Sequence, residues 1–318
     1  MTLSMNKLAV KIVKEMIDKE EELNIVSKKV GKATIIDAGL KTHSSFEIGI
    51  LVSKICLGGL ASVSITSYKI KEYFIPAVEV STDHPIEACM ASQLAGWRIK
   101  VGDFFANGSG PARALARKPK KLFEKIGYSE VSDEAVLVLE TDRYPNEKVV
   151  EYISNATNVK PENIYLVLVS PASIAGSVQV SARIVETGIF KLDTLGFDIK
   201  TIIYGYGICP VAPLHSDALK MAGRTNDMLL YGGLTYYIVN YLDDEKLKEI
   251  IDKVPSSASK DYGKSFTELV EKYGWDFLYK VDPSIFAPAV VTINNIKTGY
   301  TLRSGKVNYE ILERALSA

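Results

Sequence analysis

The chain has 318 residues, enough for one large domain or two domains of ordinary size with a substantial core. Its 38 Lys and Arg residues balance 38 Asp and Glu residues, so the charge gives no indication of a nucleic-acid partner or an anionic membrane surface. Hydrophobic residues make up 47% and charged residues 24%, as in a globular enzyme, and no uncharged apolar run approaches the roughly 18 residues of a membrane span.

The cysteines and the N-terminal segment predict where the protein works. Cys56, Cys89 and Cys209 are odd in number and far apart, which argues against a disulfide framework or a CxxC metal site. The segment MTLSMNKLAVKIVKEMIDKEEEL has an amphipathic helical pattern with charges throughout, unlike a signal peptide. The cysteine pattern therefore predicts a reducing, intracellular setting.

Helical and strand patterns alternate along the first half of the chain. In order, they predict a helix over 4–22, a strand at 32–40, a helix over 44–59, strands at 61–66 and 73–80, a helix that begins near Pro85, a strand at 97–106, a glycine-rich turn at 107–111, a short helix at 112–116 and a basic loop at 117–121.

The second half opens with a β-α-β-α run and then becomes more helical. The patterns predict a strand at 135–140, a helix over 146–156, a strand at 163–170, a helix over 177–190, a strand at 201–210, a mainly helical stretch over 216–273 with a Ser-rich break, a hairpin at 286–305 and a final helix. The predicted class is α/β, or α+β with mixed sheets.

The helix predicted over 177–190 carries three polar side chains on one line of an otherwise apolar surface. At 3.6 residues per turn, Gln179, Arg183 and Glu186 share a narrow stripe. An exposed ion pair at i,i+3 is commonplace and contributes only about 0.2–0.5 kcal/mol. A helix that is apolar over most of its circumference is normally buried, however, and a buried pair costs several kcal/mol of desolvation unless it is well paired. The pattern leaves both alternatives open.

Common signatures of other chemistries are missing. The sequence has no GxGxxG after a strand, no GxxxxGK[ST], no GxSxG and no HExxH. Its three histidines are widely separated, so a His-rich metal site is not expected and no metal is predicted. We therefore expect the chemistry to rest on carboxylates, arginines and the backbone.

Three further segments each have a functional and a structural interpretation. The turn at 107–113 places Gly108, Ser109, Gly110 and Arg113 at a helix start, which is either an anion site or an ordinary glycine turn. Asp83 and His84 precede a proline-started helix, where an Asp cap explains most of the pattern. Glu140 and Asp142 end an apolar strand, at a position that holds either ligand groups or a solvated turn.

An ordered set of segments carries a family resemblance. These are TDHPIEACMASQLAGW (82–97), NGSGPARALARKPKK (107–121), GSVQVSARIVETGIFK (176–191), GYGICPVAP (205–213), RTNDMLLYGG (224–233), SKDYGKSFTELV (259–270) and DPSIFAPA (282–289). In order and spacing they resemble methenyltetrahydromethanopterin cyclohydrolases, and the resemblance runs essentially end to end.

That resemblance implies an enzyme of archaeal-type one-carbon metabolism and methanogenesis. It interconverts the methenyl cation of tetrahydromethanopterin, plus water, and the formyl derivative. The resemblance further implies a cytoplasmic homotrimer with no prosthetic group, and two α/β domains with the active-site pocket between them. We expect one domain at 1–85 with 178–318 and the other at 86–177, divided where the character of the segments changes.

The resemblance also assigns residues. The family's catalytic arginine and glutamate fall on Arg183 and Glu186, with Glu186 expected as general base and acid and Arg183 as its electrostatic partner. We expect substrate contacts from the following residues: Gly108, Ser109, Gly110, Arg113, Asp83, His84, Gln93, Gln179, Tyr262 and Lys264. The family often carries lysine where this chain has Leu94, so affinity or the coenzyme variant can differ here.

Two other functions fit parts of the pattern. The GSGPARA segment suggests a small-molecule kinase with a Gly/Ser-rich phosphate loop, which would respond to ATP and Mg²⁺. A non-catalytic oligomeric pterin-binding protein would use Arg183 and Glu186 only to cross-link a buried interface, where matched apolar residues would serve as well.

Overall fold

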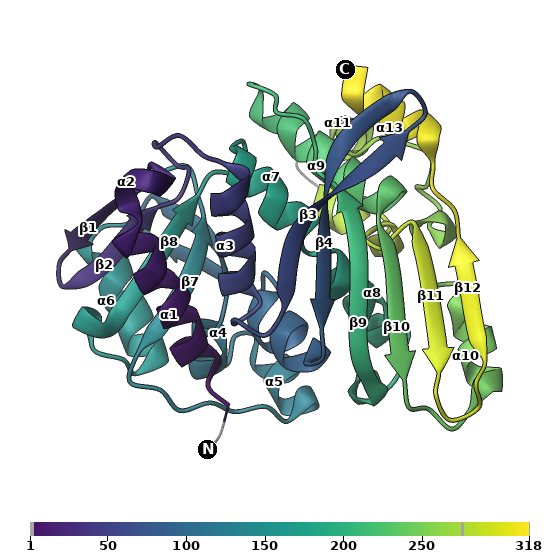
Figure 1. Cartoon of the computed structure of the whole chain (residues 1–318), viewed down its shortest axis with the longest axis horizontal. Helices are drawn as coiled ribbons and strands as arrows, with labels where there is room; N and C mark the ends of the chain where they lie inside the picture. The colour runs from purple at the N-terminus through teal and green to yellow at the C-terminus, as the bar shows by residue number, and fades with distance from the viewer. Residues whose placement is uncertain (1–2, 275–276, 318) are drawn as a thin grey trace. The chain divides into compact units, whose positions relative to one another are not determined.

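A computed structural model describes residues 3–274 and 277–317, and the chain divides into two compact units. Segments Met1–Ala61 and Ile86–Gln179 form the first unit, and Ser62–Pro85 and Val180–Ala318 form the second (Figure 1). The sequence-based division is therefore corrected: it grouped 1–61 with 178–318. In the structure β2 of the N-terminal segment pairs with β8, so that segment shares a sheet with the middle of the chain.

The first unit contains a six-stranded mixed sheet in the order β1-β2-β8-β7-β6-β5. Its strands are β1 (Val26–Val30), β2 (Ala33–Asp37), β5 (Trp97–Val101), β6 (Phe104–Ser109), β7 (Ala135–Glu140) and β8 (Ile164–Val169). Strand β8 runs parallel to both β2 and β7, whereas the other neighbouring pairs are antiparallel. The carboxyl ends of β2, β7 and β8 therefore meet at one edge of the sheet.

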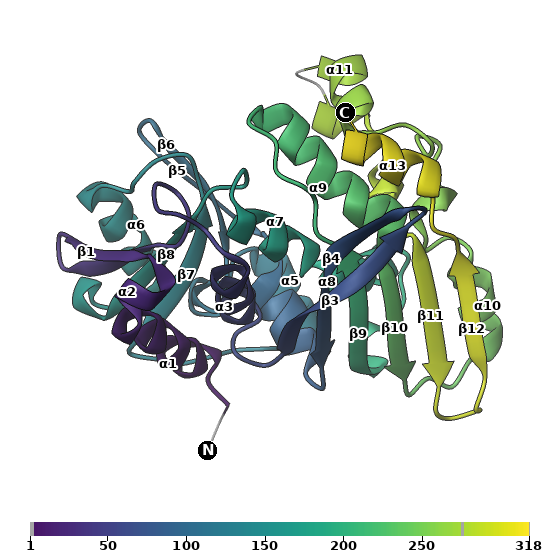
Figure 2. The ribbon, with the colours of Figure 1, turned by 45° about the horizontal axis from the view of Figure 1, so that its top comes forward.

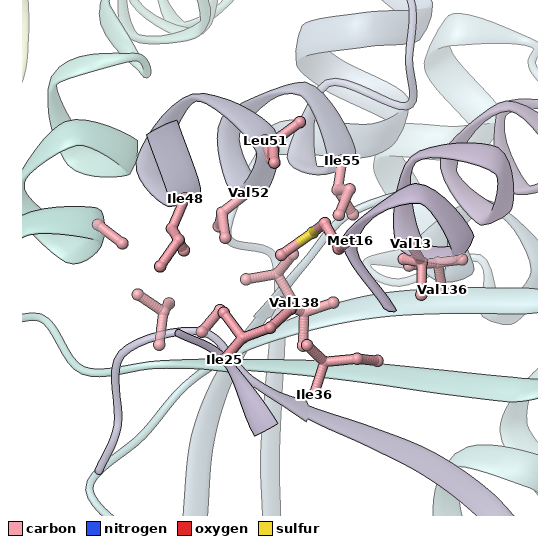
Figure 3. Close-up of a cluster of buried hydrophobic side chains, with 14 of the residues drawn as sticks. Val13, Met16, Ile25, Ile36, Ile48, Leu51, Val52, Ile55, Val136 and Val138 are labelled. Atoms are coloured by element: carbon pink, nitrogen blue, oxygen red, sulfur yellow. The ribbon is translucent and has the colours of Figure 1, made fainter. Parts of the chain in front are cut away.

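The helices of the first unit pack on both faces of this sheet. They are α1 (Met5–Asp18), α2 (Glu20–Leu23), α3 (Phe46–Cys56), the π-helix η1 (Ile86–Gln93), α4 (Ala112–Ala116), α5 (Lys120–Ile126), α6 (Glu147–Thr157), the 3₁₀ turn η2 (Pro161–Asn163) and α7 (Ile174–Ser181). On one face, side chains of α1 and α3 such as Met16 and Val52 meet Ile36 and Val138 of the sheet (Figure 3). On the other face, α4 and α6 cover Leu137 and its neighbours.

The second unit is built on another six-stranded mixed sheet, in the order β12-β11-β10-β9-β4-β3. Its strands are β3 (Ser62–Ile70), β4 (Tyr73–Thr82), β9 (Ile202–Pro210), β10 (Leu234–Val239), β11 (Val290–Asn295) and β12 (Thr301–Gly305). Only the β10–β11 pair is parallel among the described strands of this sheet. The two mixed sheets confirm the predicted α/β class.

The helices of the second unit include the one that carries the predicted catalytic pair. They are α8 (Ile184–Thr194), α9 (Ala218–Gly232), α10 (Asp244–Ile251), α11 (Phe266–Tyr273), α12 (Phe277–Lys280) and α13 (Tyr309–Ser317), with 3₁₀ turns η3 (Ile199–Thr201), η4 (Ser256–Ala258) and η6 (Pro283–Ile285). Helix α8 packs against β9, β10 and β4, and Figures 1 and 2 show the six strands side by side with α8 against them.

Three local predictions are corrected by the structure. The mainly helical stretch over 216–273 contains β10, whose residues alternate between half-buried and buried as a strand requires. The helix beginning near Pro85 is a π-helix. The helix expected over 177–190 is two helices, because α7 ends at Ser181 and α8 begins at Ile184.

Candidate active site

Arg183 lies in the turn between α7 and α8. Its N–H donates to the carbonyl of Val180, three residues back, at 3.1 Å, and its own carbonyl accepts the N–H of Thr187 at 2.8 Å. The first contact closes a tight turn and the second begins the ladder of α8. The break therefore puts Arg183 at the entrance of α8 and Glu186 in the first turn of that helix.

Arg183 and Glu186 form a buried pair. Their side chains are 14% and 8% exposed, and Arg183 Nη1 lies 3.9 Å from Glu186 Oε2. The buried alternative is thus confirmed over the solvated one. At 3.9 Å this contact is an electrostatic one rather than a hydrogen bond.

Glycines of the second sheet let the start of α8 approach closely. A Cβ on Gly205 would lie 2.7 Å from Val185, and one on Gly207 would lie 2.8 Å from Ile184. Alternate residues of β9 face the same side of the sheet, so the YGYG sequence puts both glycines under the helix and both tyrosines on the opposite face. Gly233 makes a third close approach, to Ile184. The helix that carries the pair is therefore held on a glycine-lined surface.

Tyr237 of β10 fixes the same turn of α8. Its hydroxyl donates to the carbonyl of Val185 at 2.8 Å, and the tyrosine is fully buried. A Cβ at Gly188 would lie 2.0 Å from the Tyr237 hydroxyl oxygen, so only glycine fits there with the present packing. Sequence reasoning missed Tyr237, although its place in the β-branched and aromatic run TYYIV is a signal of a strand.

Gln179, the third member of the predicted polar stripe, lies in α7 of the first unit. It is 1% exposed, and its Nε2 donates to Oε2 of Glu140 at 2.8 Å. Glu140 is half-buried at the carboxyl end of β7. Asp142, by contrast, is exposed and forms an ion pair with Arg143 at 2.9 Å, which confirms the solvated-turn interpretation for that residue.

The proposed anion site at 107–113 is not supported by the geometry. Gly108 and Ser109 belong to strand β6, and the helix that follows Pro111 has only five residues. Arg113 is fully buried, and its guanidinium donates to backbone carbonyls at the end of η1 and to that of Lys118. Burial of a cation needs such compensation, and here carbonyl oxygens supply it. Arg113 therefore ties η1 to α4, and no ligand anion is needed to explain it.

The neighbouring residues of that segment also make internal contacts. Gly110, at φ +115°, donates its N–H to the carbonyl of Ser92 at 2.9 Å. The Ser109 hydroxyl donates to the carbonyl of Gln93, and the Gln93 residue is itself fully buried. The structure thus brings Gly108, Ser109, Gly110, Gln93 and Arg113 together, as a buried junction between β6 and η1.

Asp83 and His84 are exposed at the end of β4. The hydroxyl of Thr82 accepts the N–H of His84 at 3.0 Å, which forms a local turn before the helix. Tyr262 and Lys264 lie in the segment before α11. The ring of Tyr262 packs 5.3 Å from that of Tyr231, and Lys264 Nζ lies 3.6 Å from Asp261 Oδ1.

Asp37 is a buried carboxylate that sequence reasoning did not single out. Burial alone raises its pKa, but hydrogen bonds from the Tyr144 hydroxyl and from the N–H groups of residues 39–41 outweigh burial, so the pKa lies below its ordinary value. These contacts organise the loop after β2. An acidic residue inside the apolar strand predicted at 32–40 was the available signal.

Asp227 of α9 is 3% exposed and accepts the N–H of Phe266, the first residue of α11, at 2.8 Å. Burial raises its pKa to about 7, and the charge of Glu268 adds to the shift. The residue borders a cavity of about 250 Å³ among α9, α11 and α13, whose lining includes Lys220, Arg224 and Arg314. Neither Arg183 nor Glu186 lines that cavity.

Within residues 3–274 and 277–317, no group of three or more His, Cys, Asp or Glu side chains is arranged to hold a metal ion. Cys56, Cys89 and Cys209 are all buried and free of disulfides. No helix in the described part of the chain has the length and apolarity needed to cross a membrane.

Comparison with known proteins places the chain in a family. The sequence model described as Cyclohydrolase (MCH) matches residues 4–316. A methenyltetrahydromethanopterin cyclohydrolase of Methanococcoides burtonii is 47% identical over 311 residues, covering 98% of this chain and 97% of that protein. Proteins of the same name from Methanocaldococcus jannaschii (47% over 318 residues, 99% and 98% covered) and Methanosarcina mazei (46% over 312 residues, 98% and 97% covered) are similar. The chain therefore belongs to the cyclohydrolase (MCH) family.

Proposed function

We propose that this protein interconverts methenyl-tetrahydromethanopterin, plus water, and formyl-tetrahydromethanopterin, with Glu186 and Arg183 as the catalytic pair. The names of relatives that match nearly the whole chain support the reaction. The observation that carries the residue assignment is the buried ion pair held in the first turn of α8 by a glycine-lined surface.

The substrate's reacting carbon lies between two nitrogens and carries their shared positive charge, so it is electrophilic towards water. Glu186, as a carboxylate, attracts this cation and accepts a proton as the water oxygen bonds to the carbon. Arg183 keeps the carboxylate ionised before the attack and binds the oxygen as it gains negative charge. Glu186 thus stabilises the substrate cation, and Arg183 stabilises the oxygen that gains negative charge.

Collapse of the tetrahedral adduct requires a proton on the departing nitrogen. Protonated Glu186 returns the proton that it took, the carbon–nitrogen bond breaks, and the adduct hydroxyl loses its proton as it becomes the formyl carbonyl. One water is consumed and one proton is released, so charge and atoms balance. One residue serves as base in the first half and as acid in the second.

The two other functions fare differently. The kinase alternative depended on a flexible Gly/Ser-rich loop, but that segment is a paired strand followed by a five-residue helix, which removes its main support. The non-catalytic binding alternative uses the same buried pair and is distinguished by assay. If the protein only binds the pterin, a double variant in which Arg183 and Glu186 are both replaced by apolar residues of similar size keeps its affinity for the pterin.

We further propose a cytoplasmic homotrimer that holds tetrahydromethanopterin, or a close variant, as coenzyme-substrate and needs no prosthetic group. The family membership supports these points. Sedimentation velocity tests the assembly, because the mass obtained for a trimer is three times the 35.0 kDa of one chain. A species at the monomer mass throughout the concentration range contradicts it. That the substrate pocket lies between two domains stays a prediction.

The activity is tested with the purified wild-type protein and methenyl-tetrahydromethanopterin. We expect the methenyl absorbance to decay far faster than in buffer alone, without added nucleotide, flavin or metal. A decay no faster than the spontaneous one removes the proposed function. A thermal shift with ATP and Mg²⁺ in the same protein would instead favour the kinase.

A further inference from the structure

The chain leaves β7 and β8 towards opposite faces of the first sheet. After β7 it forms α6, whose Val149 and Ile153 pack with the cluster around Leu137. After β8 it forms α7, whose Ala175 packs with the opposite cluster around Val138. In open α/β sheets, ligands bind outside the carboxyl ends of two adjacent parallel strands whose following helices lie on opposite faces of the sheet. The carboxyl ends of β7 and β8 are therefore the expected place for a ligand in this unit.

A carboxylate stands at this point. Glu140 is the last residue of β7, and the period of two in a strand puts it on the face of Val136 and Val138, where α7 also packs. Gln179 of α7 donates to Glu140 Oε2 at 2.8 Å and is itself buried, so the carboxylate is oriented by a side chain that cannot turn freely. Within the described residues Glu140 forms no ion pair and remains half-buried. It is thus an anionic acceptor without a cation.

Asn107 adds a second polar group on the same face. It lies directly opposite Glu140 in the antiparallel β6–β7 pair, so the two side chains emerge on one side of the sheet. Its amide carries both a donor and an acceptor. The carboxylate and the amide together form a pair of planar groups at the carboxyl edge.

We propose that Glu140, oriented by Gln179, binds the pyrimidine edge of the pterin substrate. This rests on the proposed function, because the substrate class comes from it. The 2-amino-4-oxo pyrimidine ring of a pterin presents an N–H and an adjacent NH₂ in one plane, and a carboxylate accepts both in parallel. The 4-oxo group next to them is an acceptor that suits the Asn107 amide. Glu140 is then a binding residue that selects the ring, and Gln179 is a positioning residue.

The test compares Glu140→Gln and Gln179→Met with the wild type, and with Glu151→Gln as a control that removes an exposed carboxylate of α6. Binding of tetrahydromethanopterin is measured by calorimetry, and KM and kcat are measured with the methenyl substrate. We expect Glu140→Gln to weaken binding about 10- to 100-fold and to raise KM similarly, with kcat at saturation much less affected, because the lost hydrogen bonds are charge-assisted and lie away from the reacting carbon. Gln179→Met should show a smaller rise in KM, and Glu151→Gln none.

The outcomes separate this inference from the function on which it rests. An active wild type whose KM and Kd stay within about twofold in folded Glu140→Gln and Gln179→Met variants overturns the assignment of Glu140 alone. Equal losses of kcat in both variants without a change in Kd also overturn it, since a binding residue acts on affinity. A wild type that neither binds nor hydrolyses the substrate overturns both proposals.

Discussion

At the scale of single residues, burial decides which polar groups are available for chemistry. Arg113 is fully buried and the Arg183 side chain is 14% exposed, and the two guanidinium groups have different neighbours. Arg113 donates to a set of backbone carbonyls, whereas Nη1 of Arg183 lies 3.9 Å from Oε2 of Glu186. The Nε and Nη1 groups of Arg113 donate to the backbone and so stabilise the fold. Arg183 lies beside a carboxylate in the first turn of α8, which is the arrangement that the proposed function uses.

Two substitutions test the role of Arg183: one keeps the positive charge and the other removes it. Arg183→Lys keeps a cation near Glu186 but loses the planar fork, so we expect kcat to fall moderately, by about tenfold. Arg183→Ala leaves the carboxylate buried without its cation, so kcat should fall by 100-fold or more. Losing one such electrostatic group typically raises the activation free energy by about 2.7–4 kcal/mol. Steady-state kinetics of both variants is the measurement. Equal activity in the two would contradict an electrostatic role.

Asp227 gives a prediction about pH. Its folded pKa of about 7 lies above the ordinary 3.8, so the folded state holds the proton more tightly. The contribution of this group to stability is then full below pH 4 and is lost as pH rises through 7, a change of up to about 4 kcal/mol. Asp227→Asn cannot titrate and can still accept the Phe266 N–H through its amide oxygen.

We therefore expect the difference in Tm between pH 5 and pH 8 to be smaller in Asp227→Asn than in the wild type. Thermal melts at several pH values measure it, and Glu151→Gln is the control. Identical pH profiles in the wild type and Asp227→Asn would show that Asp227 is ionised at pH 5 in the folded protein.

At the scale of elements, the contact of α8 with its sheet positions Arg183 and Glu186, the proposed catalytic pair. The YGYG strand, Gly188 and Tyr237 let the first turn of the helix lie close to β9 and β10. Sequence patterns predicted β2, β7 and β8 of the first sheet because their apolar runs are buried and uninterrupted, but they missed β1 and merged β5 and β6 into one strand. They missed β10 and the break before α8, where tertiary contacts outweigh local preference: Tyr237 is fixed from outside its own segment.

The fit between Gly188 and Tyr237 is testable by a double-mutant cycle. Gly188→Ala places a methyl group 2.0 Å from the Tyr237 hydroxyl, so it should destabilise the protein by roughly 1–3 kcal/mol and lower kcat as α8 shifts. In a Tyr237→Phe background the nearest ring atom lies at 3.0 Å, so the same change should cost much less.

Denaturant unfolding and kcat of the four proteins complete this cycle. Tyr236→Phe, on the opposite face of β10, is the control and should not relieve Gly188→Ala. Additive costs of Gly188→Ala and Tyr237→Phe would mean that the two residues do not share the contact.

At the scale of the whole molecule, the sequence predicted the α/β class but not how the chain is divided. The first 61 residues join the middle of the chain because β2 pairs with β8 more than 120 residues away, a parallel pairing that leaves no local signal. The polar stripe singled out Arg183 and Glu186, but periodicity left a solvated and a buried pair equally open, and the catalytic role of the two residues stays a prediction. The turn predicted at 107–111 is instead the end of strand β6 and the residues that follow it, because a Gly-Ser-Gly sequence is compatible with both a turn and a strand end.

The central claim is that a buried carboxylate moves the proton of the attacking water. The most direct measurement is the rate of methenyl hydrolysis by Glu186→Gln at saturating substrate, with its Tm as a check on folding. The amide has nearly the same size but cannot accept the proton. We predict a loss of about 10²- to 10⁴-fold in kcat with an unchanged Tm. A folded Glu186→Gln that hydrolyses the substrate at nearly the wild-type rate would contradict the account.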